Sequence, residues 1–172
     1  VAVAVWVVVF IQYYTTLSLS VGFIDSGELA TAAHTLGIAH PTGYPLFTIM
    51  GRLFSIIPIS DEVIIRLNLF SAILTSTASV VFYFFMIELL RNLKKVDRNR
   101  VMIAAGISTL FLAFSKTFWF QGVAIEVYSL HVLLICTVLL LFVKGVKTDE
   151  ARWWLLFAFV VGMAFTNHLT TV

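Results

Sequence analysis

Long apolar runs alternate with short polar connectors along this chain, and the runs have the length of membrane-crossing helices. A hydrocarbon core about 30 Å thick requires about 20 apolar residues per helical span. The pattern predicts five transmembrane helices, over residues 1–24, 63–90, 101–116, 123–143 and 153–168. The expected fold class is therefore all-α, a single multi-pass transmembrane helical domain over residues 1–172.

The polar stretch between the first two spans contains two shorter helical patterns. Over residues 26–36, apolar side chains recur at helical spacing, and Asp25 with Glu28 three residues later has the pattern of a capping box. Gly37 is the expected stop of this helix. A second amphipathic pattern covers residues 46–57. Both segments are predicted to be interfacial helices in the first extracytoplasmic loop.

Composition places the chain among integral membrane proteins. Hydrophobic residues make up 60% of it and charged residues 12%, against about 45–50% and about 25% in soluble proteins. The net charge of +2 is too small to indicate nucleic-acid binding. The single cysteine, Cys136, can form no internal disulfide. Because the chain lacks an initiator Met and stops just after a polar cluster, we expect it to be a fragment of a longer protein.

Basic residues gather in two connectors, RNLKKVDRNR at residues 91–100 and KGVKTDEAR at residues 144–152. The positive-inside rule places both in the cytoplasm. The apolar stretch between them must then cross the membrane twice, as a hairpin whose tip lies outside, near Ser115 to Glu126. The same parity brings Asp25, Glu126 and His168 to one extracytoplasmic surface.

Asp25 and Glu28 are the candidate catalytic residues. An ionised carboxylate at a helix N-terminus can accept a proton from an acceptor hydroxyl. Helix capping alone is the competing explanation for both residues. His40, beside a proline in the following turn, is a candidate substrate-binding residue, whereas His34 is interpreted as a surface histidine.

Arg52 and Arg66 are candidates for holding a phosphate, because guanidinium groups bind phosphate bidentately. An arginine on an interfacial helix, such as Arg52, is more often a snorkelling charge than a ligand. Arg66 follows the start of an apolar span, where an arginine should face the protein interior or a hydrated cavity.

Further polar side chains near the predicted outer surface complete the candidate substrate-binding set. They are Glu126, Tyr128, His131, Asn167 and His168. The alternatives are that the first three end a helix among interfacial aromatic residues, and that the last two form an interhelical hydrogen-bonded pair. No metal site is predicted, since the sequence has no HExxH, cysteine pair or Asp-rich calcium loop.

Four sequence blocks, in order, carry a family resemblance: DSGELATAAHTLGIAHPTGYPLFTIMGRLFS, RLNLFSA, FWFQGVAIEVYSLH and TNHLT. They resemble domain of unknown function 2723, classed as glycosyltransferase family 117 of the GT-C superfamily, with protein O-mannosyltransferase activity attributed to its animal members. The resemblance implies a GT-C-like N-terminal membrane module. Asp25 with Glu28 would stand for the family's acidic motif, although two residues separate them where better-known O-mannosyltransferases have an adjacent Asp-Glu pair.

The implied reaction is an inverting transfer of mannose or a similar hexose to a serine or threonine hydroxyl of an acceptor protein. The donor substrate would be a polyprenyl- or dolichyl-phosphate sugar, taken from the membrane lipid, with no other cofactor. A bacterial inner membrane is expected rather than an ER membrane, with the active site on the periplasmic or lumenal side. The alternatives are a transporter or flippase for a lipid-linked or anionic substrate, and a structural anchor. The crowding of polar groups on one side favours the enzyme.

Overall fold

The computed structural model describes residues 1–22, 24–91 and 97–169, and all of its regular elements are helices. In chain order they are α1 (Ala2–Thr15), α2 (Ser26–Thr35), α3 (Pro45–Ser55), α4 (Val63–Leu90), α5 (Arg98–Ala113), α6 (Lys116–Val123), α7 (Val127–Thr148) and α8 (Ala151–Asn167). The all-α fold class expected from the sequence is confirmed for this part of the chain.

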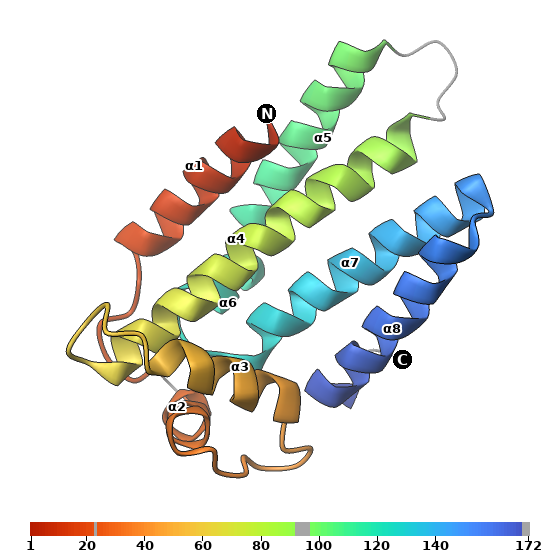
Figure 1. Ribbon diagram of the computed structural model, residues 1–172. Coiled ribbons are helices and arrows are strands. Elements are labelled where there is room, and N and C mark those ends of the chain that lie inside the picture. Colours follow the sequence, from red (N-terminus) through yellow and green to blue (C-terminus); the bar gives the residue numbers. More distant parts are fainter. Residues whose placement is uncertain (23, 92–96, 170–172) are drawn as a thin grey trace.

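The long helices α4 and α7 form the centre of the molecule (Figure 1). Among the described helices, these two are long and apolar enough to cross a membrane by themselves. A third span results if α5 and α6 are counted together, although they are bent by 68° at their junction. Helix α4 has the predicted bounds of the second span, whereas α1 ends at Thr15 instead of continuing to residue 24.

The hairpin tip expected between the third and fourth spans is a short helix. α5 ends at Ala113, α6 follows, and α7 begins only at Val127. The Tyr13 hydroxyl of α1 donates a hydrogen bond of 2.7 Å to the Ala113 carbonyl oxygen. A Cβ on Gly122 would lie 2.7 Å from the Tyr13 ring, so this close approach of α6 to α1 requires glycine. Tertiary packing therefore replaces the simple turn that the sequence suggested.

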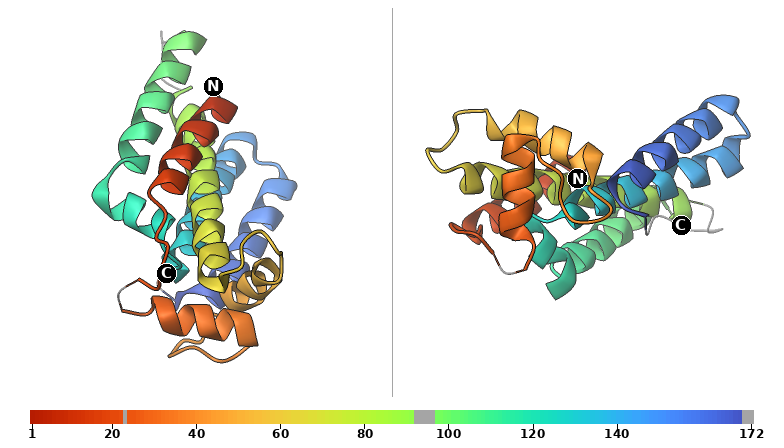
Figure 2. Two further views of the ribbon diagram at one scale, coloured as in Figure 1. Left: turned by 90° about the vertical axis from the view of Figure 1, so that its left-hand side faces the viewer. Right: turned by 90° about the horizontal axis from the view of Figure 1, so that it is seen from below.

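Helices α2 and α3 lie across one end of the bundle (Figure 2). They pack closely on each other, because a Cβ on Gly51 of α3 would come within 2.9 Å of the Ala33 Cβ of α2. Their bounds agree with the predicted helices to within two residues. The stop of α2 differs from the prediction: Leu36, not Gly37, takes the left-handed conformation, with a φ of 56°. The interfacial position of the two helices stays a prediction.

Asn68 of α4 joins three separate segments at this same end. Its side chain is fully buried, and its amide nitrogen donates to the Ser18 carbonyl oxygen at 2.8 Å. Its carbonyl oxygen accepts from the Ile125 backbone N–H, also at 2.8 Å. One side chain thus fixes the loop that precedes α2 and the segment that precedes α7.

The described parts of both basic connectors lie at the opposite end of the bundle. Lys147 of α7 forms an ion pair of 3.4 Å with Glu88 of α4, and Arg91 approaches the same carboxylate at 3.8 Å. The predicted grouping of the two connectors at one end is confirmed for these residues, while Lys94 and Lys95 lie outside the described residues. Their cytoplasmic position stays a prediction.

Candidate functional site

The centre of the candidate site is a bond between α2 and the loop that follows it. Glu28 lies in the first turn of α2, and its Oε1 accepts a hydrogen bond of 2.6 Å from the His40 backbone N–H. Its Oε2 lies 3.1 Å from Nδ1 of the same histidine. These N–H groups favour the ionised carboxylate, so they lower the pKa of Glu28. Glu28 therefore closes the loop and fixes the orientation of the imidazole.

The other imidazole nitrogen of His40 faces a tyrosine and the second candidate carboxylate. Nε2 lies 3.0 Å from the Tyr44 hydroxyl and 4.0 Å from the Asp25 carboxylate. With Nδ1–H directed at Glu28, Nε2 is the nitrogen that accepts a proton. Tyr44 is buried, and burial, followed by the negative groups around it, raises its pKa. His40 thus links Glu28, Asp25 and Tyr44 in one polar network.

The Asp25 side chain is available because it does not cap its helix. Asp25 is the N-cap residue of α2 but makes no capping hydrogen bond, and Glu28 bonds His40 rather than the Asp25 backbone N–H. The capping box expected from the sequence is therefore not formed. Asp25 remains 44% exposed, which leaves its carboxylate accessible to a hydroxyl or a cation.

Glu126 brings a third carboxylate to the same place. It lies between α6 and α7 and is half-buried. Burial first, and then the negative charge of Asp25, raise the pKa of Glu126 to about 7, while His40 acts in the opposite direction. Asp25 and Glu126 therefore lie at the same end of the helices, as the connector parity predicted.

Aromatic rings from three segments adjoin these groups. Tyr44 and His168 are stacked, with ring centroids 5.6 Å apart and planes 8° apart. The rings of Tyr128 and His131, both on α7, each have centroids 5.2 Å from that of His168. The prediction that Tyr128 and His131 of α7 lie at the same end of the helices as His168 is confirmed. Asn167 is buried, and its amide nitrogen contacts the Val127 carbonyl oxygen at 3.5 Å, so it helps to join α8 to α7.

The two candidate phosphate-binding arginines lie elsewhere. Arg52 occupies the last turn of α3, while Tyr44 precedes its first turn, and the Arg52 guanidinium donates to the His34 carbonyl oxygen. Arg66 donates to the Ser60 carbonyl oxygen at 2.6 Å and to that of Ser55 at 2.8 Å. These bonds give both arginines a structural task at the C-terminal ends of α2 and α3. Their role in holding phosphate stays a prediction.

Two residues of this region were missed by the sequence analysis. Tyr44 lies in a Pro/Gly turn, where no sequence signal separates a network tyrosine from a loop tyrosine. Asn68 could have been found, because a carboxamide within an apolar helical span must be hydrogen-bonded inside the protein. Both residues contribute to the site by positioning other residues of it.

Asp25, Glu28 and His40 could together hold a metal ion. Each offers one ligand atom, and these atoms lie within 4.8 Å of one another. Carboxylate oxygen and imidazole nitrogen are ligands for several divalent metals. Glu28 and His40 are already bonded to each other, whereas Asp25 approaches His40 only at 4.0 Å, so the geometry supports a polar network as well as a cation site. The expectation that the chain has no metal site stays untested.

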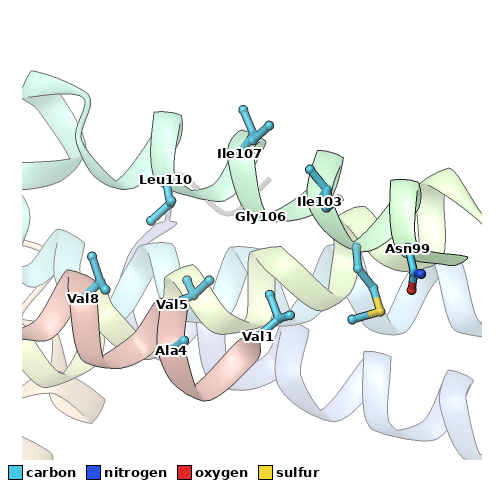
Figure 3. A pocket seen from close by; sticks show the side chains of 10 residues that line it. Val1, Ala4, Val5, Val8, Asn99, Ile103, Gly106, Ile107 and Leu110 are labelled. Carbon is cyan, nitrogen blue, oxygen red and sulfur yellow. The ribbon is translucent and has the colours of Figure 1, made fainter.

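Four grooves of the described part of the chain are separate from the polar network. One apolar groove of about 620 Å³ lies between α1 and α5 (Figure 3). Two others adjoin it, and a fourth lies at the basic end, lined by residues that include Glu88 and Lys147. None of the four is lined by Asp25, Glu28 or Glu126. The network is therefore distinct from these four grooves.

Comparison with known proteins gives a consistent result. The family model "Protein O-mannosyl-transferase TMEM260 N-terminal domain" matches residues 25–172. The protein O-mannosyl-transferase TMEM260 of Mus musculus is 31% identical over 175 residues, which cover 99% of this chain and 24% of that protein. A Dictyostelium discoideum protein of the same name is 31% identical over 177 residues, covering 94% and 20%. The chain thus spans a quarter or less of the length of these relatives. No solved structure matches.

Proposed function

Because the chain belongs to the family of the TMEM260 protein O-mannosyl-transferase N-terminal domain, we propose that it carries the catalytic carboxylates of a membrane-bound glycosyltransferase that acts on proteins. The observation that supports this most directly is the meeting of Asp25, Glu28 and Glu126 around His40. Two apolar helices of membrane-crossing length agree with a membrane enzyme. The two named relatives are eukaryotic, so they give no support to a bacterial membrane.

The proposed reaction is a single displacement at the anomeric carbon of a polyprenyl-phosphate sugar of the GT-C type. Asp25 takes the proton from a serine or threonine hydroxyl of the acceptor protein. The hydroxyl oxygen forms the new bond to the anomeric carbon, and the bond from that carbon to the phosphate oxygen breaks. The polyprenyl phosphate leaves with the electron pair, and the configuration at carbon inverts. A carboxylate of low basicity serves because the hydroxyl becomes strongly acidic in the transition state.

The neighbouring groups have complementary roles in this scheme. Glu28 holds His40, and His40 can accept a hydrogen bond at Nε2 or carry a positive charge near the departing phosphate. Glu126, whose pKa is raised to about 7, is partly protonated at neutral pH and can donate a hydrogen bond to a sugar hydroxyl. Tyr128, His131 and His168 form an aromatic wall against which a sugar ring can pack.

The test is a transfer assay on the full-length protein in membranes. Radiolabelled polyprenyl-phosphate mannose and a serine/threonine acceptor peptide are supplied to wild type, Asp25→Asn and the control Asp97→Asn. We expect Asp25→Asn to lower transfer by about 100-fold or more, because general base catalysis contributes about 10²–10⁴-fold. Asp97→Asn, at the far end of the bundle, should leave transfer unchanged. Equal transfer by Asp25→Asn and wild type would remove Asp25 from the mechanism.

A further inference from the structure

A continuous groove runs along α5 on the side that faces α1, away from the polar network. Its middle part, of about 620 Å³, is lined by apolar side chains of both helices and by Asn99. Val5 and Val8 of α1 point toward α5, and Leu110 of α5 points toward α1 (Figure 3). A Cβ on Gly106 would meet nothing within 4 Å, so the groove is open above this residue.

The groove continues in both directions along α5. Ile107 and Leu110 also line an apolar groove of about 560 Å³ that reaches Phe114. Val1 and Met102 also line a polar cavity of about 660 Å³ at the other end, which Arg91 and Arg98 border. From Arg98 to Phe114 the helical rise gives about 24 Å, which is most of the hydrocarbon thickness of a bilayer, about 30 Å.

We propose that this groove binds an anionic phospholipid, with its phosphate between Arg91 and Arg98 and one acyl chain along the apolar surface of α1 and α5. The shape fits a narrow, flexible apolar chain, because the lining is apolar from Met102 to Phe114, over most of the length of α5. The charge fits a phosphate, because the two arginines border the cavity at which the apolar part ends. Basic pockets between transmembrane helices on the cytoplasmic side bind anionic lipid headgroups.

The arginines at this end differ in what already holds them. Arg100 forms an ion pair of 3.1 Å with Asp97, and Arg152 is paired with Glu150 at 2.5 Å. Among the described residues, the ion-pair contact of the Arg91 side chain is one of 3.8 Å with Glu88, whose nearer partner is Lys147 at 3.4 Å. A phosphate that reaches Arg91 therefore competes with a weak contact rather than with a short ion pair.

The test measures lipid binding to the purified full-length protein by native mass spectrometry. Phosphatidylglycerol, which is anionic, is compared with phosphatidylcholine, which is zwitterionic. For Arg91→Gln/Arg98→Gln we expect phosphatidylglycerol affinity to fall about thirtyfold, since one basic residue near an anionic lipid is worth about fivefold. The control Arg100→Gln/Arg152→Gln removes the same charge from the same end outside the groove and should change the affinity by less than about threefold.

A second pair of variants tests the acyl-chain part of the groove. Gly106→Leu fills the open space above α5, whereas Gly162→Leu makes the same change on α8, where a Cβ also meets nothing within 4 Å. We expect the first to weaken binding of both lipids and the second to leave it unchanged. The proposal would be overturned if each groove variant changed lipid affinity by the same factor as its control variant outside the groove. A photo-crosslinker at Ile107 that captures protein rather than lipid would also overturn it, because another helix would then occupy the groove.

Discussion

Two helices of this protein begin after an aspartate, α2 after Asp25 and α5 after Asp97, and the two aspartates behave differently. Asp97 accepts a hydrogen bond of 2.8 Å from the Arg100 backbone N–H, which is an ordinary N-cap. Asp25 makes no capping bond, and its carboxylate lies 4.0 Å from the His40 imidazole. The same residue type at the same helical position is thus structural at one end of the bundle and available for chemistry at the other.

The start of α2 is held by other bonds that replace the missing cap. Asn68 fixes the loop before it, and Glu28 fixes the loop after it. Within the described residues, the side-chain bonds at the start of α5 are local, and they include the 3.1 Å ion pair of Arg100 with Asp97. Where tertiary contacts hold the start of a helix, the side chain of the N-cap residue does not have to cap it. The comparison can be tested by removing the tertiary contacts in one variant and the capping side chains in others.

The largest effect should follow from removing the tertiary support. Asn68→Leu leaves the Ser18 carbonyl oxygen and the Ile125 N–H without their partner, and each buried unpaired group costs about 1–3 kcal/mol. We expect the free energy of unfolding to fall by about 3 kcal/mol, measured by thermal unfolding in detergent. The control Thr109→Val removes a buried hydroxyl that bonds its own helix at Ala105 and should cost below about 1 kcal/mol. Similar losses for both variants would contradict a special role of Asn68.

An intermediate effect should separate the two aspartates. Asp97→Ala removes a capping bond and should lower the free energy of unfolding by about 1 kcal/mol. Asp25→Ala removes no cap and should change it by less than about 0.5 kcal/mol. Thermal unfolding of both variants side by side is the measurement. A larger loss for Asp25→Ala would restore capping as the explanation of Asp25.

A further test concerns the pH dependence of stability that Glu126 contributes. Its pKa is raised to about 7 in the folded protein, so the folded state binds its proton more tightly than the unfolded state does. The contribution of this raised pKa to the stability of the folded protein is fully present below the ordinary pKa of a glutamate. It is lost as the pH rises through about 7. Glu126→Gln cannot ionise and should therefore lose less stability than wild type between about pH 5 and about pH 8. If the curves of stability against pH were parallel for Glu126→Gln and wild type, the Glu126 carboxyl would be solvated in the folded protein.

Much of the fold was predictable, because apolar length and basic connectors are strong signals in a membrane protein. The bounds of α4 and the placement of Asp25 and Glu126 at one end followed from run length and charge parity alone. The bend at α6 could not be predicted, since it depends on hydrogen bonds of Tyr13 and Asn68, which are far from α6 in the sequence. Local pattern predicts which segments are helical, whereas the angles between them are set by single buried contacts.

Most of the side chains that meet at the candidate site could be selected from the sequence, but the bonds between them could not. His40, Glu126, His131 and His168 were each ambiguous alone, and their selection depended on a shared side of the membrane. Helical periodicity favoured a bond from Glu28 to the start of its own helix, but the carboxylate bonds His40 instead. Nothing in the sequence indicated that Arg66 would donate to backbone carbonyl oxygens at a helix end, while its role in holding phosphate stays a prediction.

The two bonds of the Asn68 side chain also bear on how this end of the molecule forms during synthesis. Ser18 precedes Asn68 on the chain, so the amide nitrogen has its partner as soon as α4 leaves the ribosome. Ile125 is synthesised 57 residues later, and until then the carbonyl oxygen lacks the backbone N–H from which it accepts. The end of the bundle that holds Asp25 and Glu28 is therefore completed only after α4, α5 and α6 have been produced.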